Sequence, residues 1–138
     1  MPRIELLAWE TARADASRIR TIVFVEEQRV PPDIELDEMD APSVHALAFV
    51  DGRAVGTGRL LPDGHIGRMA VLREARAQGV GSAILEHLVA EAGRRGVREV
   101  VLAAQTHAVP FYRRHGFAPV GAVYEEAGIP HQDMRRVL

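Results

Sequence analysis

The chain has 138 residues, of which 47% are hydrophobic and 26% are charged. This size and composition suit one compact domain that spans residues 1–138. The formal net charge of −2 argues against a general nucleic-acid binder, which would be strongly basic. The longest apolar runs are five residues, whereas about 20 are needed to cross a bilayer. We therefore expect no membrane segment, and the absence of an apolar N-terminal stretch predicts a cytoplasmic protein.

Two amino-acid types that carry much of protein chemistry are absent. The chain has no cysteine, which excludes disulfides, thiolate nucleophiles and cysteine-ligated metals. All 17 basic residues are arginine, which excludes lysine Schiff bases and the lysine-dependent phosphate loop. No dense spacing of histidines and carboxylates appears, so we predict no metal site.

The first part of the chain predicts a strand, a helix and an antiparallel meander. A short apolar run predicts a strand at residues 4–9. Helical spacing of apolar residues then predicts a helix from Thr11, its expected N-cap, to about Glu27. Three strand patterns follow, separated by the turn sequences Asp51-Gly52 and Pro62-Asp63-Gly64, at residues 44–50, 54–61 and 65–71.

An acidic segment lies between the helix and the meander. Residues 26–40 hold seven acids and one base, while the rest of the chain is net basic. Such a segment can raise the local concentration of a cationic substrate. The alternative is a solvated loop without a role in binding.

The second part returns to a helical period and then to strands. The patterns predict a helix from Val80 that ends near residues 93–96, a buried strand at 97–104, a short helix at 106–115, and strands at 117–123 and 129–137. The whole order predicts an α/β (mixed α+β) protein. We expect a single central, largely antiparallel mixed sheet with helices on both faces.

A glycine-rich turn precedes the predicted helix at Val80. Such a turn at a helix N-terminus presents free backbone N–H groups, which bind anionic phosphates. Gly79 and Gly81 allow close approach of the backbone, and Arg76 and Ser82 add a charge and a hydroxyl. Neither common nucleotide fingerprint is present, so by itself the turn is equally consistent with an ordinary loop-to-helix junction.

Two motifs in their context give a more specific indication. The sequences IGRMAV at 66–71 and RAQGVG at 76–81 resemble the strand and pyrophosphate loop, (R/Q)xxGxG/A, of the GNAT superfamily of N-acetyltransferases. The sequence from Gln105 to Phe117 is similar to a second signature of that superfamily, with Gln105 where asparagine is usual. Segments 20–28, 37–40 and 125–131 resemble the ElaA/YjcF-like branch, so the resemblance covers nearly the whole chain.

This resemblance implies a GNAT-like acyl-CoA N-acyltransferase fold and direct acetyl transfer from acetyl-CoA to an amine in a ternary complex. The acceptor would be a small-molecule or protein amine, and a homodimer is left open. A bulge near Gly67 would free backbone groups of its strand for the donor. The residues that the resemblance assigns to acetyl-CoA are Met69, Ala70, Val71, Arg76, Ala77, Gln78, Gly79, Val80, Gly81, Ser82 and Gln105.

The resemblance also places Tyr112 beside the sulfur of CoA. A phenol that protonates a thiolate works uphill by about 1.5 pKa units, or about 2 kcal/mol, so a hydrogen bond to the leaving thiolate is the safer role. The alternative for Tyr112 is an aromatic plug beside Phe111. Glu26, His65 and His131 are candidates for the general base, and the sequence does not decide among them. The residues assigned to the acceptor side are Gln28, Asp37, His65 and Arg68.

Two other classes of function remain open on the sequence. One is a CoA-binding sensor that kept the fold and lost catalysis, although the presence of Tyr112 disfavours it. The other is a partner-binding α/β domain that uses its acidic segment as an interaction surface. A CoA-binding sensor binds acetyl-CoA, whereas a partner-binding domain does not. Only an enzyme transfers the acetyl group to an amine.

Overall fold

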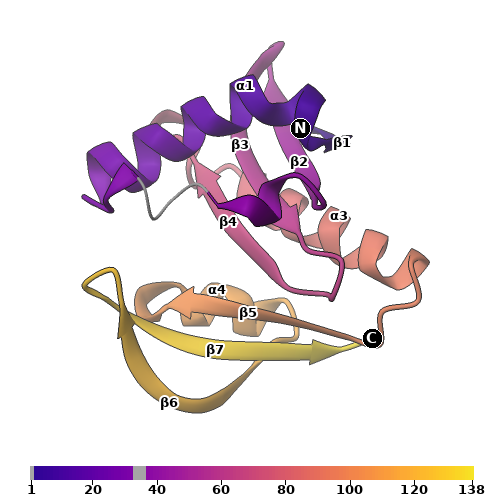
Figure 1. The fold of residues 1–138 in the computed structure, drawn as a ribbon, viewed down its shortest axis with the longest axis vertical. Coiled ribbons are helices and arrows are strands. Elements are labelled where there is room, and N and C mark those ends of the chain that lie inside the picture. Colours follow the sequence, from indigo (N-terminus) through magenta and orange to yellow (C-terminus); the bar gives the residue numbers. More distant parts are fainter. Residues whose placement is uncertain (1, 33–36) are drawn as a thin grey trace.

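The computed structural model describes residues 2–32 and 37–138 (Figure 1). The chain opens with β1 (Arg3–Ala8), α1 (Trp9–Arg20) and a π-helix, η1 (Thr21–Glu27). The expected N-cap at Thr11 is wrong, because β1 runs directly into α1 and Ala8 takes the cap position. The expected helix does extend to Glu27, but its last seven residues are wound as a π-helix.

The predicted meander is confirmed and forms most of the first sheet. Its strands are β2 (Val44–Val50), β3 (Arg53–Leu60) and β4 (Ile66–Val71), and the sheet order is β1-β2-β3-β4 with antiparallel pairs throughout. Asp51 and Gly52 both have positive φ, at 52° and 77°. This is the geometry of the hairpin turn that the Asp-Gly sequence predicts.

The remaining elements form a second, three-stranded sheet with two helices. These are α3 (Val80–Arg94), β5 (Glu99–Gln105), α4 (Val109–Arg114), β6 (Ala118–Glu126) and β7 (Ile129–Val137). The sheet order is β5-β7-β6, again antiparallel. Three short 3-10 turns complete the described chain: η2 (Glu38–Asp40), η3 (Arg73–Ala75) and η4 (Thr106–Ala108).

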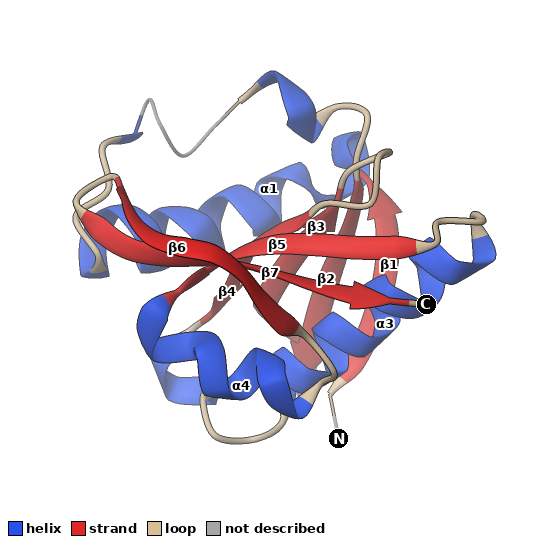
Figure 2. Ribbon diagram, turned by 90° about the horizontal axis from the view of Figure 1, so that it is seen from below, coloured by secondary structure: helices blue, strands red, loops and turns tan. Residues whose placement is uncertain are grey.

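The mixed α/β class is confirmed, with α1 on one side of the strands and α3 and α4 on the other (Figure 2). The expected single sheet is divided where β4 and β5 meet. Only the bridge between His65 and Val101 and a hydrogen bond from Val101 N–H to the Gly64 carbonyl, at 3.2 Å, are described between them. Beyond the bridge the two strands diverge, and the second sheet lies apart from the first (Figure 1).

Close packing of α3 on the first sheet fixes the position of the helix. Gly56 and Gly58 on β3 lie beneath it, and a Cβ built on either glycine would come within 2.9 Å of Ile84. Ile84 and Leu88 are fully buried in the main core between helix and sheet. The N-terminus of α3 is thereby held beside the end of β4.

Candidate active site

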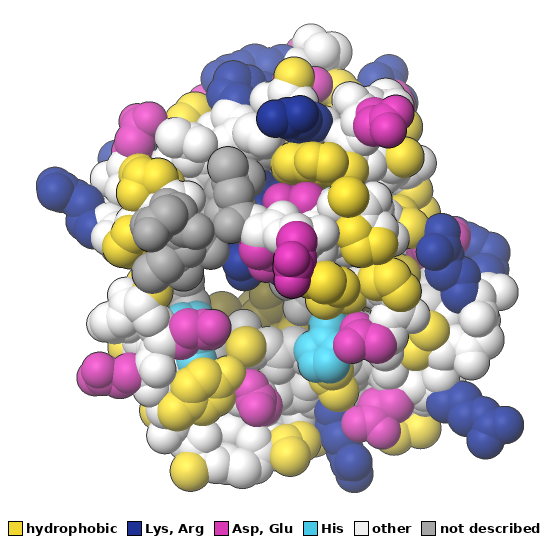
Figure 3. Space-filling view, viewed as in Figure 1, with side chains coloured by type: hydrophobic (Ala, Val, Ile, Leu, Met, Phe, Trp, Pro, Cys, Tyr) yellow, Lys and Arg dark blue, Asp and Glu magenta, His cyan; other side chains and the backbone are white. Residues whose placement is uncertain are grey.

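A cavity of about 640 Å³ lies at the divergence of the two sheets. Its walls come from η1 and the residues after it, from β4, from β5 and η4, and from the turn between β6 and β7. Figure 3 shows the surface hollowed between the two halves of the molecule, with histidine side chains at the margin. Segments far apart in the chain therefore meet at one site.

Most of the residues predicted from the sequence line this cavity. They are Gln28, His65, Arg68, Met69, Ala70, Val71, Arg76, Gln105, Tyr112 and His131. Glu26 is exposed and is not among the lining residues. Asp37 also lies outside the lining, but it contacts Arg68 and Arg59, which belong to it. The turn from Ala77 to Ser82 lies next to the cavity, after Arg76.

The expected bulge in β4 is present. Thr57 pairs with Ala70 and Arg59 pairs with Gly67, so β4 has one residue more than β3 across this stretch. The positive φ of 51° falls on Arg68, whereas a Cβ on Gly67 would meet nothing within 4 Å. A bulge takes a residue out of the regular ladder, and here it does so on the wall of the cavity.

The glycine-rich turn has the backbone geometry of an anion-binding site. Ala77 and Gly79 have φ of 63° and 78°, and α3 begins at Val80 directly after Gly79. The N–H groups in the first turn of a helix have no partner within the helix and lie at its positive end. The turn can thus hold a phosphate with its backbone.

The guanidinium of Arg76 contacts other groups in the structure. Its Nε donates to the Val71 carbonyl at 2.9 Å, and one Nη donates to both carboxylate oxygens of Glu27 at 2.9 and 3.0 Å. Arg73 lies 3.7 Å from the same carboxylate. Glu27 lines the cavity and was missed by the sequence argument, which selected Glu26.

The π-helix explains this change from Glu26 to Glu27. Gln28 N–H donates to the Val23 carbonyl at 3.1 Å, five residues back, where an α-helix would bond four residues back. The wider turn changes which side chains share a face of the helix. Spacing counted for an α-helix therefore selects Glu26, whereas in the π-helix Glu27 faces the cavity. Phe24 and Gln28 line the cavity on the same face as Glu27.

Gln28 joins η1 to the second sheet. Gln105 Nε2 donates to Gln28 Oε1 at 2.7 Å, and Gln105 Oε1 lies 2.9 Å from His107 Nε2. Gln105, at the position where asparagine is usual in the signature that it resembles, thus contacts Gln28, which was assigned to the acceptor side from the sequence. His107 also lines the cavity, although no sequence pattern pointed to it.

Tyr112 projects into the cavity from α4 and is held by packing. Burial raises the pKa of its phenol to about 12. Its hydroxyl donates to the Met69 sulfur at 3.8 Å, and its ring packs edge-on against Phe111 and Phe117. The phenol therefore stays protonated at neutral pH, with only a weak acceptor for its proton.

His131 presents one ring nitrogen in a defined state. Its Nδ1 donates to the Ile129 carbonyl at 2.7 Å, which places the proton of the neutral ring on Nδ1. Nε2 is left as the basic atom, 3.9 Å from the Glu126 carboxylate. The ring is 9% exposed and stacks on Tyr124, so its orientation is fixed.

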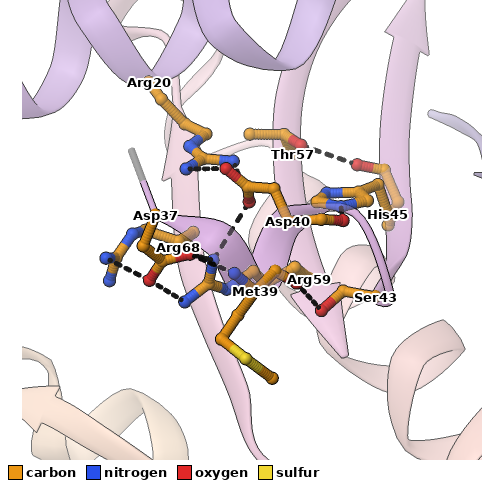
Figure 4. A network of polar contacts seen from close by, with 10 residues as sticks. Arg20, Asp37, Met39, Asp40, Ser43, His45, Thr57, Arg59 and Arg68 are labelled. Carbon is orange, nitrogen blue, oxygen red and sulfur yellow. Dashed lines mark hydrogen bonds and ion pairs between the residues drawn. The ribbon is translucent and has the colours of Figure 1, made fainter. Parts of the chain in front are cut away.

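Paired arginines neutralise two aspartates of the acidic segment (Figure 4). Asp40 is buried and bonds Arg20 at 2.9 and 3.1 Å and Arg59 at 3.0 Å. Asp37 bonds Arg59 at 2.6 and 3.0 Å and Arg68 at 3.2 Å. Asp33 and Glu35 lie outside the described residues. At Asp37 and Asp40 the segment is an ion-pair network beside the cavity rather than an unpaired acidic surface.

The pKa values of these aspartates follow from their partners. The hydrogen bond from Arg59 holds the pKa of Asp37 below its usual value. Burial alone would raise the pKa of Asp40, but the hydrogen bonds and charges of Arg20 and Arg59 outweigh it, and the net shift is downward. Both carboxylates are ionised at neutral pH.

Metal-ligating groups do not gather in the described part of the chain. Within residues 2–32 and 37–138 no three histidine or carboxylate side chains are placed to share a metal ion. Among the helices of these same residues, none combines the length and apolar character that crossing a bilayer demands.

Comparison with known proteins gives a consistent result. The family model described as "Acetyltransferase (GNAT) domain" matches residues 17–138. The chain is 39% identical over 126 residues to the uncharacterized N-acetyltransferase YjcF of Bacillus subtilis, covering 88% of this chain and 90% of that protein. It is 34% identical over 127 residues to the protein ElaA of Escherichia coli, covering 86% and 83%.

A solved structure matches over the full length. The crystal structure of an acyl-CoA N-acyltransferase from Pseudomonas aeruginosa superimposes with a TM-score of 0.88 at 33% sequence identity, covering 99% of this chain and 100% of that chain. The fold is therefore shared with a protein of that description.

Proposed function

We propose that this protein moves an acetyl group directly from acetyl-CoA to an amine in a ternary complex. The chain belongs to the GNAT acetyltransferase family and is an N-acetyltransferase. The absence of cysteine fits direct transfer, because no thiol can carry the acetyl group. The acceptor in this proposal is a small-molecule or protein amine. The observation that carries it is one cavity that joins a strand bulge, a protonated phenol and an oriented imidazole.

The residues of the donor side fit a CoA thioester. Acetyl-CoA supplies the activated acetyl group when it is bound. The backbone at Met69, Ala70 and Val71 would hold the pantetheine arm, because the bulge interrupts the β3 ladder between Gly67 and Ala70 and the other edge of β4 diverges from β5. The turn up to Ser82 would hold the pyrophosphate with the N–H groups at the start of α3. A backbone N–H near Met69 would also stabilise the negative charge that develops on the thioester oxygen.

Tyr112 would stabilise the leaving thiolate by a hydrogen bond. With the phenol pKa at about 12 and a thiol near 8.5, full proton transfer is uphill by about 3.5 units, or about 5 kcal/mol. A hydrogen bond requires no such transfer. Because the Met69 sulfur is a weak acceptor, the Tyr112 hydroxyl can exchange this hydrogen bond for one to the thiolate.

His131 is the general base in this proposal, and Glu26 is not. The attacking nitrogen must lose a proton, and a base takes it directly or through one water. His131 faces the cavity with Nε2 as its basic atom, while Glu26 is exposed outside the lining. Gln28, His65 and Arg68 line the acceptor side, and Asp37 acts on that side through Arg68.

The first experiment is calorimetric titration of the protein with acetyl-CoA and with CoA, followed by mass spectrometry of a panel of amines. One-to-one binding together with an acetylated amine supports the proposal. Binding without transfer to any amine favours a CoA-binding sensor. No binding of either ligand contradicts the donor site and favours a partner-binding domain.

A further inference from the structure

A chain of three polar side chains ends at the proposed pyrophosphate turn. Ser82 Oγ lies 3.0 Å from His115 Nε2, and His115 Nδ1 lies 2.6 Å from Glu86 Oε2. Ser82 and Glu86 lie one turn apart on α3, while His115 follows α4. No step of the proposed reaction uses His115 or Glu86.

The surroundings of His115 hold its ring in place. Arg136 of β7 donates to the His115 carbonyl at 3.0 Å and lies 3.5 Å from the Glu86 carboxylate. The ring of Phe111 packs against the imidazole with centroids 5.0 Å apart. The His115 side chain is 16% exposed. Among the described hydrogen bonds of His115, Glu86 from α3 contacts the ring, Arg136 from β7 contacts the backbone carbonyl, and the backbone N–H donates to the Tyr112 carbonyl.

The directions of the hydrogen bonds follow from the chemistry of the groups. A carboxylate only accepts, so His115 Nδ1 carries a proton and donates to Glu86. In the neutral ring Nε2 then has a lone pair and accepts the hydroxyl proton of Ser82. The hydroxyl consequently directs its proton at the histidine, and its oxygen lone pairs are left for the N-terminus of α3.

Protonation of His115 reverses that last bond. Nε2–H of the imidazolium donates to Ser82 Oγ, and the hydroxyl proton becomes free to donate to a phosphate oxygen. The change also places a positive charge on His115, which contacts Ser82 at the end of the turn. Both effects favour a bound anion, and charge-assisted hydrogen bonds are about twice as strong as neutral ones.

We propose that His115 is a positioning residue for the donor, and that CoA binding is coupled to uptake of one proton by the Ser82–His115–Glu86 chain. The proton comes from solvent and forms the N–H bond at His115 Nε2; no bond between heavy atoms changes. Histidine is the side chain that gains a proton between pH 8 and 5. The inference rests on the proposed donor site, but it concerns affinity rather than transfer.

The test is titration of the protein with CoA at pH 8.0, 7.0 and 6.0, in pairs of buffers with different ionisation enthalpies. For each protein we compare the ratio of the Kd at pH 8.0 to the Kd at pH 6.0. We expect this ratio to be at least threefold larger for the unchanged protein than for His115→Gln. We also expect the unchanged protein to take up more protons per CoA. His87→Gln is the matched control, because His87 is an exposed histidine on α3 whose described hydrogen bond goes to the Ala83 carbonyl.

Two further measurements test whether the pH dependence comes from the protein rather than from CoA, and whether it passes through Ser82. Dephospho-CoA lacks the 3′-phosphate, which titrates in the same range, and the difference between protein and variant must persist with it. Ser82→Ala removes the reversed hydrogen bond but keeps the charge of His115, so its pH dependence should lie between those of the unchanged protein and His115→Gln, which keeps the test valid if one variant folds poorly. Equal pH dependence and proton uptake in the unchanged protein and both variants overturn the inference. Failure of the unchanged protein to bind CoA at all would instead contradict the proposed function.

Discussion

At the scale of single residues, burial decides what Tyr112 can contribute. A phenol with a pKa of about 12 is protonated at every pH at which the enzyme would be assayed. Its contribution is therefore a hydrogen bond, and hydrogen bonds to charged groups contribute about 1.5–3 kcal/mol. The sequence placed Tyr112 at the site, but it could not supply this pKa, because burial depends on how Phe111 and Phe117 pack around the ring.

We expect Tyr112→Phe to lower kcat by about 10- to 100-fold and to change the Kd of CoA by less than about twofold. Because the phenol does not titrate below pH 10, the loss in kcat should be equal at pH 7 and pH 9. The measurements are steady-state rates at both pH values and calorimetry with CoA. An equal loss in affinity and turnover would show that the ring only shapes the site.

Glu27 and the proposed donor compete for Arg76. An ion pair between partly exposed groups contributes about 0–1 kcal/mol, so its removal should release Arg76 to a pyrophosphate at little cost. We expect Glu27→Gln to lower the Kd of CoA by up to about fivefold. Arg73→Gln removes a charge that lies 3.7 Å from the Glu27 carboxylate, and it should not lower the Kd of CoA. Weaker CoA binding in Glu27→Gln would mean that the pair positions Arg76 rather than competing for it.

At the scale of elements, local patterns predicted what local physics determines. The period-two strands and the Asp51-Gly52 turn were confirmed, because alternation and a turn residue act within a few positions. The start of α1 and the π-helix were missed. Both depend on how α1 is fitted between β1 and the cavity wall, which no short window of sequence contains. The 3-10 turn at Thr106–Ala108 occupies the start of the expected helix, so that α4 begins only at Val109.

Packing of α3 on β3 gives a test at this scale. Gly58→Ala would bring a Cβ within 2.9 Å of Ile84 and 3.1 Å of Leu88, and such overpacking costs about 1–3 kcal/mol. We expect this loss in the free energy of unfolding by urea. Gly67→Ala, in the neighbouring strand with nothing within 4 Å, should change it by less than about 0.5 kcal/mol. Similar losses in the two variants would contradict the packing argument.

At the scale of the whole molecule, contacts between distant segments completed the site. Arg20 and Asp40 are 20 residues apart, and Gln28 and Gln105 are 77 apart. Composition showed an acidic segment but could not show that arginines from α1, β3 and β4 neutralise Asp37 and Asp40. The two GNAT-like motifs did predict the part of the cavity lining that comes from β4, Arg76, η4 and α4, but not the part that comes from η1 or from the turn between β6 and β7.

The buried His45 makes the stability of the molecule depend on pH. Burial lowers the pKa of its ring, which donates to the Asp40 carbonyl at 2.8 Å. Below about pH 6.5 the unfolded chain binds a proton that the folded ring does not, so the folded state loses stability as the pH falls. The lowered pKa values of Asp37 and Asp40 extend this loss to more acidic pH.

We expect the free energy of unfolding to fall by up to about 1 kcal/mol between pH 6.5 and 5.5. Urea unfolding at a series of pH values measures it. His45→Gln should flatten the curve in this interval, while the exposed His87→Gln should not. A curve that keeps its slope in His45→Gln would place the titrating group elsewhere.

The division of the sheet has a consequence for isotope exchange. Along the facing edges of β4 and β5, a single bridge between His65 and Val101 is described. Amides on those edges beyond the bridge should exchange with deuterium quickly, while their neighbours bonded to β3 or β7 exchange slowly. Each strand would then show an alternating pattern of protection, and a ligand that lies between the strands would be visible as the loss of that alternation.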